Sequence, residues 1–156
     1  MTRQVAHMKW IDIPPVWLAL AIFCTWAIAE IQPAFLRIEG AIVDLMAGVL
    51  IGGGILLMLL AVIRMRQHNT TIIPHMYAKS LVTSGIFAKT RNPIYLGDAL
   101  VLAGIALRFE APIALLLVPL FMLTITHRFI QSEENRLRQT FGDEFIGYCQ
   151  KTRRWV

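Results

Sequence analysis

The chain has 156 residues, of which 56% are hydrophobic, and it carries a formal net charge of +5. Its mean hydropathy of +0.59 is too high for an ordinary soluble domain, and its long uncharged runs are typical of a membrane protein. The basic residues lie between and after the apolar runs rather than on one soluble face. They therefore indicate membrane topology and argue against nucleic acid as a partner.

Two apolar runs in the first part of the chain are long enough to span a bilayer. They cover residues 16–35 and 42–63, and each reaches the length of about 20 residues that a spanning helix needs. The second run contains Gly48 and Gly52, and small residues at this spacing let membrane helices pack closely. We expect these two glycines to face another helix, within the chain or across a dimer. Gly53 and Gly54 are candidates for the close approach of a ligand.

A polar stretch and two shorter apolar runs follow. Residues 64–93 hold five basic residues and no acid. Residues 94–107 and 113–125, joined by a tight turn, predict a helical hairpin whose helices extend past the apolar limits. The charged remainder predicts an amphipathic helix to about Thr140, a break at Gly142 and a further short helix.

The expected fold is therefore all-α, a polytopic membrane protein with about four transmembrane helices and a cytosolic C-terminal amphipathic segment. It forms one domain over residues 1–156, with two N-terminal spans in 1–63 and the loop, hairpin and C-terminal helices in 64–156. With both termini on the inner side, thirteen of the fifteen basic residues lie inside. This bias predicts cytoplasmic termini, and a bacterial inner membrane is the expected location.

Two adjacent carboxylates, Glu133 and Glu134, stand at the inner end of the last apolar run. Such a pair can accept hydrogen bonds from ligand hydroxyls or bind a cation. The alternative is a solvated helix end that pairs with Arg136 or Arg138. Cys24 and Cys149 lie at different depths without metal-ligand spacing, so we expect free thiols and no metal site.

Three further residues are candidates for catalysis. Asp98 is an acid within the apolar hairpin, and intramembrane carboxylates usually face a polar cavity or a partner. A structural pairing of Asp98 with Arg91, Arg128 or a helix N-terminus is the alternative. His75 is a candidate base or substrate contact, although an ordinary interfacial loop histidine fits as well. Arg128 completes the candidate set.

Two short segments are candidates for cofactor binding. The first contains Leu81, Val82, Thr83, Gly85 and Phe87, and it predicts an extended piece and a turn whose backbone can hold a cofactor. The second contains Arg91, Asn92, Pro93 and Tyr95. Pro93 suits the first turn of a helix, and Arg91 and Tyr95 fit the headgroup level of a membrane.

Taken together, these segments resemble a known family. The matching pieces are Leu81-Val82-Thr83-x-Gly85-x-Phe87, Arg91-Asn92-Pro93-x-Tyr95-x-Gly97, Glu133-Glu134-x-x-Leu137, Phe141-Gly142-x-x-Phe145-x-x-Tyr148 and Arg153-Arg154-Trp155. In this order, around a membrane hairpin, the chain resembles the integral-membrane methyltransferases of the isoprenylcysteine carboxyl methyltransferase and phospholipid N-methyltransferase superfamily. The resemblance covers roughly residues 70–155.

The resemblance implies S-adenosylmethionine as the methyl donor, bound in a pocket at the cytosolic face. It suggests that Glu133 and Glu134 bind the ribose hydroxyls or the amino group, and that Asn92 and Tyr95 line the cleft. The Leu81 to Phe87 piece would supply backbone contacts. Asn92 stands where many members have histidine, which puts a histidine-based acid–base role there in doubt. The family lends Asp98 no role.

The function implied is methyl transfer to a lipophilic or small acceptor whose carboxylate, amine or thiol reaches the membrane face. Two alternatives remain open. One is an NADPH-dependent oxidoreductase like the sterol reductases, although the chain has no Gly-x-Gly-x-x-Gly motif. The other is a non-enzymatic membrane scaffold. The sequence does not identify the acceptor.

Overall fold

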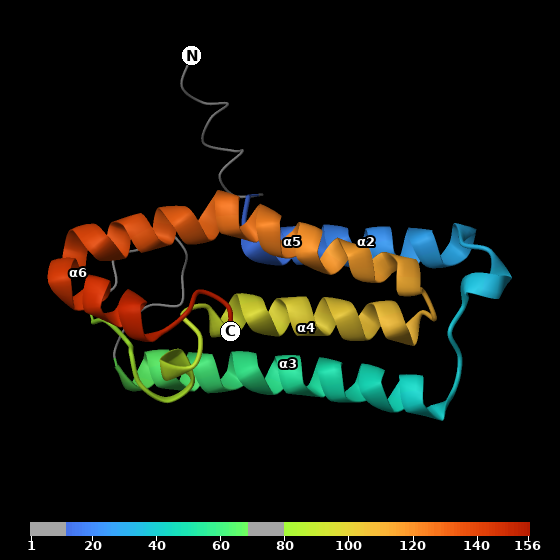
Figure 1. Cartoon of the computed structure of the whole chain (residues 1–156), viewed down its shortest axis with the longest axis horizontal. Coiled ribbons are helices and arrows are strands. Elements are labelled where there is room, and N and C mark those ends of the chain that lie inside the picture. The colour runs from blue at the N-terminus through green and yellow to red at the C-terminus, as the bar shows by residue number, and fades with distance from the viewer. Residues whose placement is uncertain (1–11, 69–79) are drawn as a thin grey trace, which may run out of the picture.

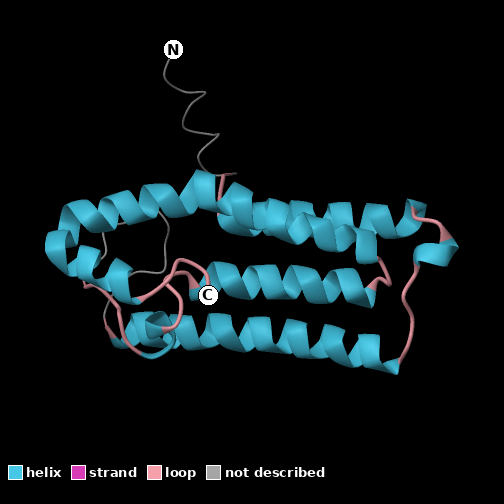
Figure 2. Cartoon of the chain, in the orientation of Figure 1, coloured by secondary structure: helices cyan, strands magenta, loops and turns pink. Residues whose placement is uncertain are grey.

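The computed structural model describes residues 12–68 and 80–156, and in these ranges every regular element is helical (Figure 2). The chain is all-α, as the sequence predicts. The main helices and the short turns between them follow in this order: α2 (Pro14–Ile31), η1 (Ala34–Leu36), α3 (Ala41–Gln67), η2 (Gly85–Ala88), α4 (Pro93–Arg108), η3 (Pro112–Leu116), α5 (Leu117–Ile125), η4 (Thr126–Ile130) and α6 (Gln131–Lys151).

The helices form a bundle with α4 at its centre. Figure 1 shows α3 along one side of α4, and α2 and α5 along the other. The core on the second side contains Tyr95 and Leu102 of α4 with Phe121 and Ile125 of α5. The central position of α4 explains why half of its 16 residues are buried and only Arg108 is exposed, whereas α2, α3 and α5 expose many large apolar side chains.

Three helical stretches are long and apolar enough to cross a membrane. They are Pro14–Ile31, Ala41–Gln67 and the continuous run Pro112–Lys151. Helix α4 has 16 residues and spans about 24 Å at 1.5 Å per residue, which is short for an independent span. Its neighbours cover it, so it runs beside them as the first half of the predicted hairpin.

Proline sets several of the helix limits. Pro14 and Pro93 stand in the first turns of α2 and α4, where the missing N–H leaves no hydrogen bond unmade. Helix α2 ends at Ile31, earlier than the predicted limit at residue 35. The reason is that Gln32 precedes Pro33 and adopts an extended backbone, as residues before proline prefer.

Helices α3 and α4 approach closely at glycines. A Cβ atom added to Gly54 would lie 2.6 Å from the carbonyl oxygen of Gly97, and one added to Gly104 would lie 2.8 Å from that of Ala47. A Cβ added at Gly48 or Gly52 would meet nothing within 4 Å. The prediction that Gly48 and Gly52 pack against a helix of this chain is therefore wrong. The rotation of α3 turns Gly54 toward α4 instead.

The last helical run leaves the bundle and bends back toward it. A π-helical turn, η4, joins α5 to the polar helix α6 without a break. Gly142 then takes a φ of 50° and a ψ of −122°, which favours glycine and bends α6. The break predicted at Gly142 is thus confirmed. It returns the end of α6 and the tail to the start of α4 (Figure 1).

Candidate functional site

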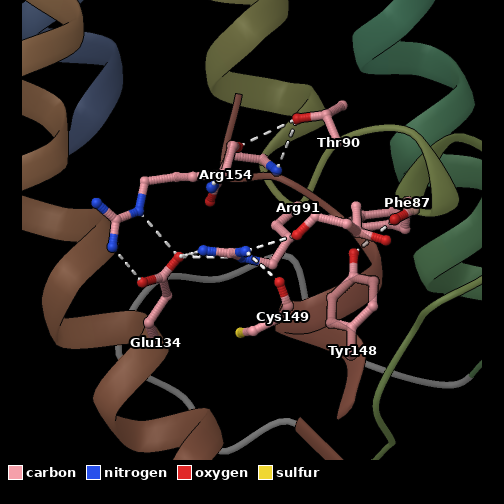
Figure 3. A network of polar contacts seen from close by, with 9 residues as sticks. Phe87, Thr90, Arg91, Glu134, Tyr148, Cys149 and Arg154 are labelled. Atoms are coloured by element: carbon pink, nitrogen blue, oxygen red, sulfur yellow. Dashed lines mark hydrogen bonds and ion pairs between the residues drawn. The ribbon is translucent and has the colours of Figure 1, made fainter. Parts of the chain in front are cut away.

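Glu134 lies at the centre of a polar network where α6, the start of α4 and the C-terminal tail meet. Its Oε1 accepts hydrogen bonds from Nη2 of Arg91 at 2.8 Å and from Nε of Arg154 at 3.1 Å, and its Oε2 accepts one from Nη2 of Arg154 at 2.6 Å. Figure 3 shows both guanidinium groups converging on this carboxylate. Only 14% of the Glu134 side chain is exposed, so these ion pairs are better shielded than surface pairs.

The tail is joined to residues 90–92 by further hydrogen bonds. Arg91 donates from its backbone N–H to the carbonyl of Arg153 at 3.0 Å and from Nη1 to the carbonyl of Thr152 at 2.6 Å. The carbonyl of Arg154 accepts hydrogen bonds from Thr90 and from Nδ2 of Asn92. The segment before α4 and the tail therefore form one hydrogen-bonded unit.

Glu133 faces α4, away from the arginine pair. Its Oε1 accepts a hydrogen bond of 2.9 Å from the hydroxyl of Tyr95, which is buried one turn inside the helix from Asn92. Within the described residues, the other carboxylate oxygen of Glu133 has no hydrogen bond. That oxygen is available to accept a hydrogen bond from a ligand hydroxyl or amino group.

The two adjacent carboxylates have opposite electrostatic surroundings. They lie beyond the apolar limit of the last span, in the polar helix α6. Burial raises the pKa of Glu133, and the Tyr95 hydrogen bond and Arg136 offset this only in part. Burial alone would also raise the pKa of Glu134, but the hydrogen bonds from Arg154 and Arg91 outweigh it and hold that pKa below its usual range.

The segment that contains Leu81, Val82, Thr83, Gly85 and Phe87 reaches the site at one end. Leu81, Val82 and Thr83 have no regular structure, and η2 begins at Gly85 with a φ of +63°. The hydroxyl of Tyr148 donates a 2.6 Å hydrogen bond to the carbonyl of Phe87, which fixes η2 to α6 (Figure 3). In the described residues, no hydrogen bond joins Leu81, Val82 or Thr83 to the Glu134 network.

The three candidate catalytic residues are not brought together. Asp98 is buried in α4, 7% exposed, and pairs with neither Arg91 nor Arg128. Arg128 instead donates from Nε to Asp12 at 2.7 Å and lies over the Trp17 ring, 4.9 Å from its centroid. His75 lies outside the described residues.

The structure therefore brings together Arg91, Asn92, Tyr95, Glu133 and Glu134, five of the predicted cofactor-binding residues, with Pro93 at the helix start beside them. Two other participants have no predicted role. Arg154 and Tyr148 belong to motifs that the sequence displays, and their place in those motifs is the only sequence signal for them. No group of three or more His, Cys, Asp or Glu in the described part of the chain is placed to hold a metal ion.

Comparison with known proteins decides the family. The family model described as phospholipid methyltransferase matches residues 43–144. The chain belongs to the phospholipid methyltransferase family. Membership indicates a membrane methyltransferase, in agreement with the apolar helices, and bears out the resemblance seen in the sequence.

A relative of unknown role also matches. The chain is 40% identical over 63 residues to an uncharacterized protein of Haemophilus influenzae, over 40% of this chain and the whole of that protein. No solved structure matches the chain. The family match includes Tyr95, Glu133 and Glu134 and ends before the tail that holds Arg154.

Proposed function

We propose that this phospholipid methyltransferase family member transfers a methyl group from S-adenosylmethionine to a lipophilic acceptor at the cytosolic membrane face, and that residues 1–156 act as one catalytic unit. The observation that carries the proposal is Glu133. Its carboxylate is oriented by the Tyr95 hydroxyl and retains one oxygen without a hydrogen bond in the described residues.

The residues at the site fit the proposed cofactor. S-adenosylmethionine, when bound, supplies an electrophilic methyl group on a sulfonium centre. The open oxygen of Glu133 suits a ribose hydroxyl or an amino group. Nδ2 of Asn92 is held by the tail, and its Oδ1, which accepts no hydrogen bond from the described residues, can accept one from the ligand. Backbone groups of Leu81, Val82, Thr83, Gly85 and Phe87 would border the same ligand.

Glu134 and Arg91 have a different role in this proposal. Both oxygens of Glu134 are engaged by arginines, so it positions Arg91 and Arg154 rather than binding the ligand directly. The ion pairs hold the tail against the start of α4, and this keeps Asn92 and Tyr95 in place. Such preorganisation lowers the cost of aligning two reactants.

Asp98 is the candidate proton acceptor. It lies three residues after Tyr95, so the helical repeat places it on a neighbouring part of the same face, one turn deeper. An amine or thiol acceptor must lose a proton during methylation, whereas a carboxylate acceptor need not. Arg128 is engaged by Asp12, and His75, the other candidate base, lies outside the described residues.

The decisive experiment is calorimetric titration of the detergent-purified protein with S-adenosylmethionine and S-adenosylhomocysteine, with NADPH as the comparison ligand. We expect both sulfur ligands to bind, and Glu133→Gln to weaken them about tenfold through loss of a charge-assisted hydrogen bond. Glu144→Gln is the matched control, since Glu144 is exposed on the same helix. Asp98→Asn should leave this binding unchanged and lower methyl transfer.

The result that would overturn the proposal is a folded protein that binds neither sulfur ligand. Binding of NADPH alone would favour the oxidoreductase alternative. Equal affinities for the Glu133 and Glu144 variants would remove Glu133 from the ligand site, and full activity of Asp98→Asn would remove Asp98 from the chemistry.

A further inference from the structure

Arg136 is a cation beside the site, and neither the motifs nor the proposed function gives it a role. It lies on α6, three residues after Glu133, at an open position of the Glu133-Glu134-x-x-Leu137 motif. Side chains three apart on a helix are neighbours, with Cβ atoms about 5–6 Å apart. Arg136 and Glu133 therefore share one face of α6.

Arg136 has no ion pair within the described residues. The sequence leaves open a solvated helix end in which the two adjacent glutamates pair with it. The structure does not form that pairing, because both oxygens of Glu134 are held by other arginines and Glu133 accepts a hydrogen bond from Tyr95. Arg136 also donates no hydrogen bond to any described residue, so its guanidinium keeps all its donors for a ligand.

The guanidinium of Arg136 interacts electrostatically with the Glu133 carboxylate. Burial raises the pKa of Glu133, and the Tyr95 hydrogen bond and the positive charge of Arg136 oppose that rise. Arg136 is partly buried, whereas Arg138 on the same helix is exposed. The described residues thus present a carboxylate oxygen without a hydrogen bond and an unpaired cation on neighbouring turns of one helix.

We propose that Arg136 binds the α-carboxylate of S-adenosylmethionine while the open oxygen of Glu133 binds its α-ammonium group, an inference that rests on the proposed function. The amino-acid group of this ligand is a zwitterion with both charges on one carbon atom, so it matches two opposite charges held side by side. A guanidinium suits a carboxylate because its parallel N–H donors reach both oxygens. A ribose hydroxyl at Glu133 would leave Arg136 without an anion, whereas the amino-acid group engages both residues.

Calorimetric titration in detergent tests the carboxylate contact without any methyl transfer. Decarboxylated S-adenosylmethionine keeps the ammonium group and lacks the carboxylate, and we expect the parent protein to bind it about tenfold more weakly than S-adenosylmethionine. Arg136→Gln should weaken S-adenosylmethionine about tenfold and leave the decarboxylated ligand unchanged, because that ligand has no group for Arg136 to bind. Arg138→Gln, an equal change of charge at an exposed site on the same helix, should affect neither ligand.

A third ligand tests the ammonium contact. 5′-Methylthioadenosine keeps the ribose and lacks the whole amino-acid group. Glu133→Gln should therefore weaken decarboxylated S-adenosylmethionine and leave 5′-methylthioadenosine unchanged. Equal weakening of the two would place Glu133 at the ribose and overturn the ammonium contact.

The outcomes separate this inference from the proposed function. Equal affinities of the parent for S-adenosylmethionine and its decarboxylated form, equal effects of Arg136→Gln and Arg138→Gln, or equal weakening of both ligands by Arg136→Gln would overturn the role of Arg136 alone. If Arg136→Gln does not fold, Arg136→Lys keeps the charge but loses the paired donors, and it should weaken S-adenosylmethionine only. A folded parent that binds none of the three ligands overturns the proposed function, and this inference with it.

Discussion

Glu134 binds two guanidinium groups at once, and this sets its contribution apart from that of a surface ion pair. Charge-assisted hydrogen bonds contribute more than neutral ones, and the low exposure of Glu134 limits screening by water and salt. Removing the charge leaves Arg91 and Arg154 close to each other without a shared anion. Repulsion between them then adds to the lost hydrogen bonds.

We therefore expect Glu134→Gln to lower the free energy of unfolding by roughly 1–3 kcal/mol at neutral pH, the range for a hydrogen bond to a charged group. Thermal or chemical unfolding in detergent measures this loss. Glu144→Gln, an exposed site on the same helix, should stay within about 0.5 kcal/mol of the parent. Similar losses in the two variants would contradict the role of the network.

The same loss should depend on pH. The pKa of Glu134 in the folded protein is lower than its ordinary value of 4.5. The stability it contributes is therefore fully present above the unfolded pKa and is lost as the pH falls through the folded pKa. The difference in free energy of unfolding between the parent and Glu134→Gln should thus be constant above about pH 6. It should shrink as the pH falls below 4.5. Glu133, whose pKa burial raises, titrates in both proteins, and its pKa should be less raised in Glu134→Gln because the neighbouring charge is gone.

At the scale of helices, the contact between α3 and α4 depends on glycine. The carbonyl oxygens of Gly54 and Gly97 each occupy the space where the other residue would place a Cβ atom. Close backbone approach increases van der Waals contact, which is a main source of helix association in lipid. The short helix α4 is held in the bundle largely through this face.

Gly54→Ala should destabilise the protein by about 1–3 kcal/mol, because the added methyl group overlaps the Gly97 carbonyl. Gly52→Ala is the matched control on the same helix, where a methyl group meets nothing within 4 Å. It should change the free energy of unfolding by less than about 0.5 kcal/mol. Melting temperatures in one detergent compare the two, and equal shifts would show that α3 and α4 are less tightly packed than described.

The sequence predicts the helices well because the signals for them are local. The length of each apolar run, the prolines at Pro14 and Pro93 and the glycine at Gly142 act on their own neighbourhood. The packing role of Gly54 rather than Gly48 could not be predicted in this way. It depends on the rotation of α3 against α4, which no single segment encodes.

The same distinction applies to the site. The motifs indicate that Arg91, Tyr95, Glu133 and Glu134 belong together, but they do not say which partner each carboxylate takes. Glu133 and Glu134 are neighbours in sequence and point to different partners because successive helical residues differ by about 100°. The candidate pairing of Asp98 with an arginine fails because Arg91 and Arg128 are already engaged elsewhere.

For the whole molecule, the distribution of charge defines two unlike ends. The outer turns hold only Arg37 and Arg108, and each lies within 4.0 Å of an acid, Glu110 and Asp44 respectively. In the sequence, the other thirteen basic residues belong to the segments that the predicted topology assigns to the inner side. We propose on this basis that both termini are cytoplasmic, since an excess of lysine and arginine marks the cytoplasmic side.

Fusions expressed in a bacterial host test this orientation. A fluorescent protein joined to the C-terminus should fluoresce, because it matures on the cytoplasmic side of the membrane. Alkaline phosphatase at the same place should be inactive, because it matures on the outer side. Alkaline phosphatase inserted after Glu39, in the predicted outer turn, should be active and serves as the control. The reverse pattern would place both termini outside.

The hydrogen bonds between the tail and the start of α4 also impose an order on biosynthesis. The residues that meet there are separated by 43 to 64 positions, and Thr152 and Arg154 are translated after all of α2 to α5. Translation proceeds from the N-terminus at about 5–20 residues per second, so α2 to α5 are synthesised before these partners exist. The network can therefore close only after α2 to α5 have been synthesised, and it cannot guide the first steps of their folding.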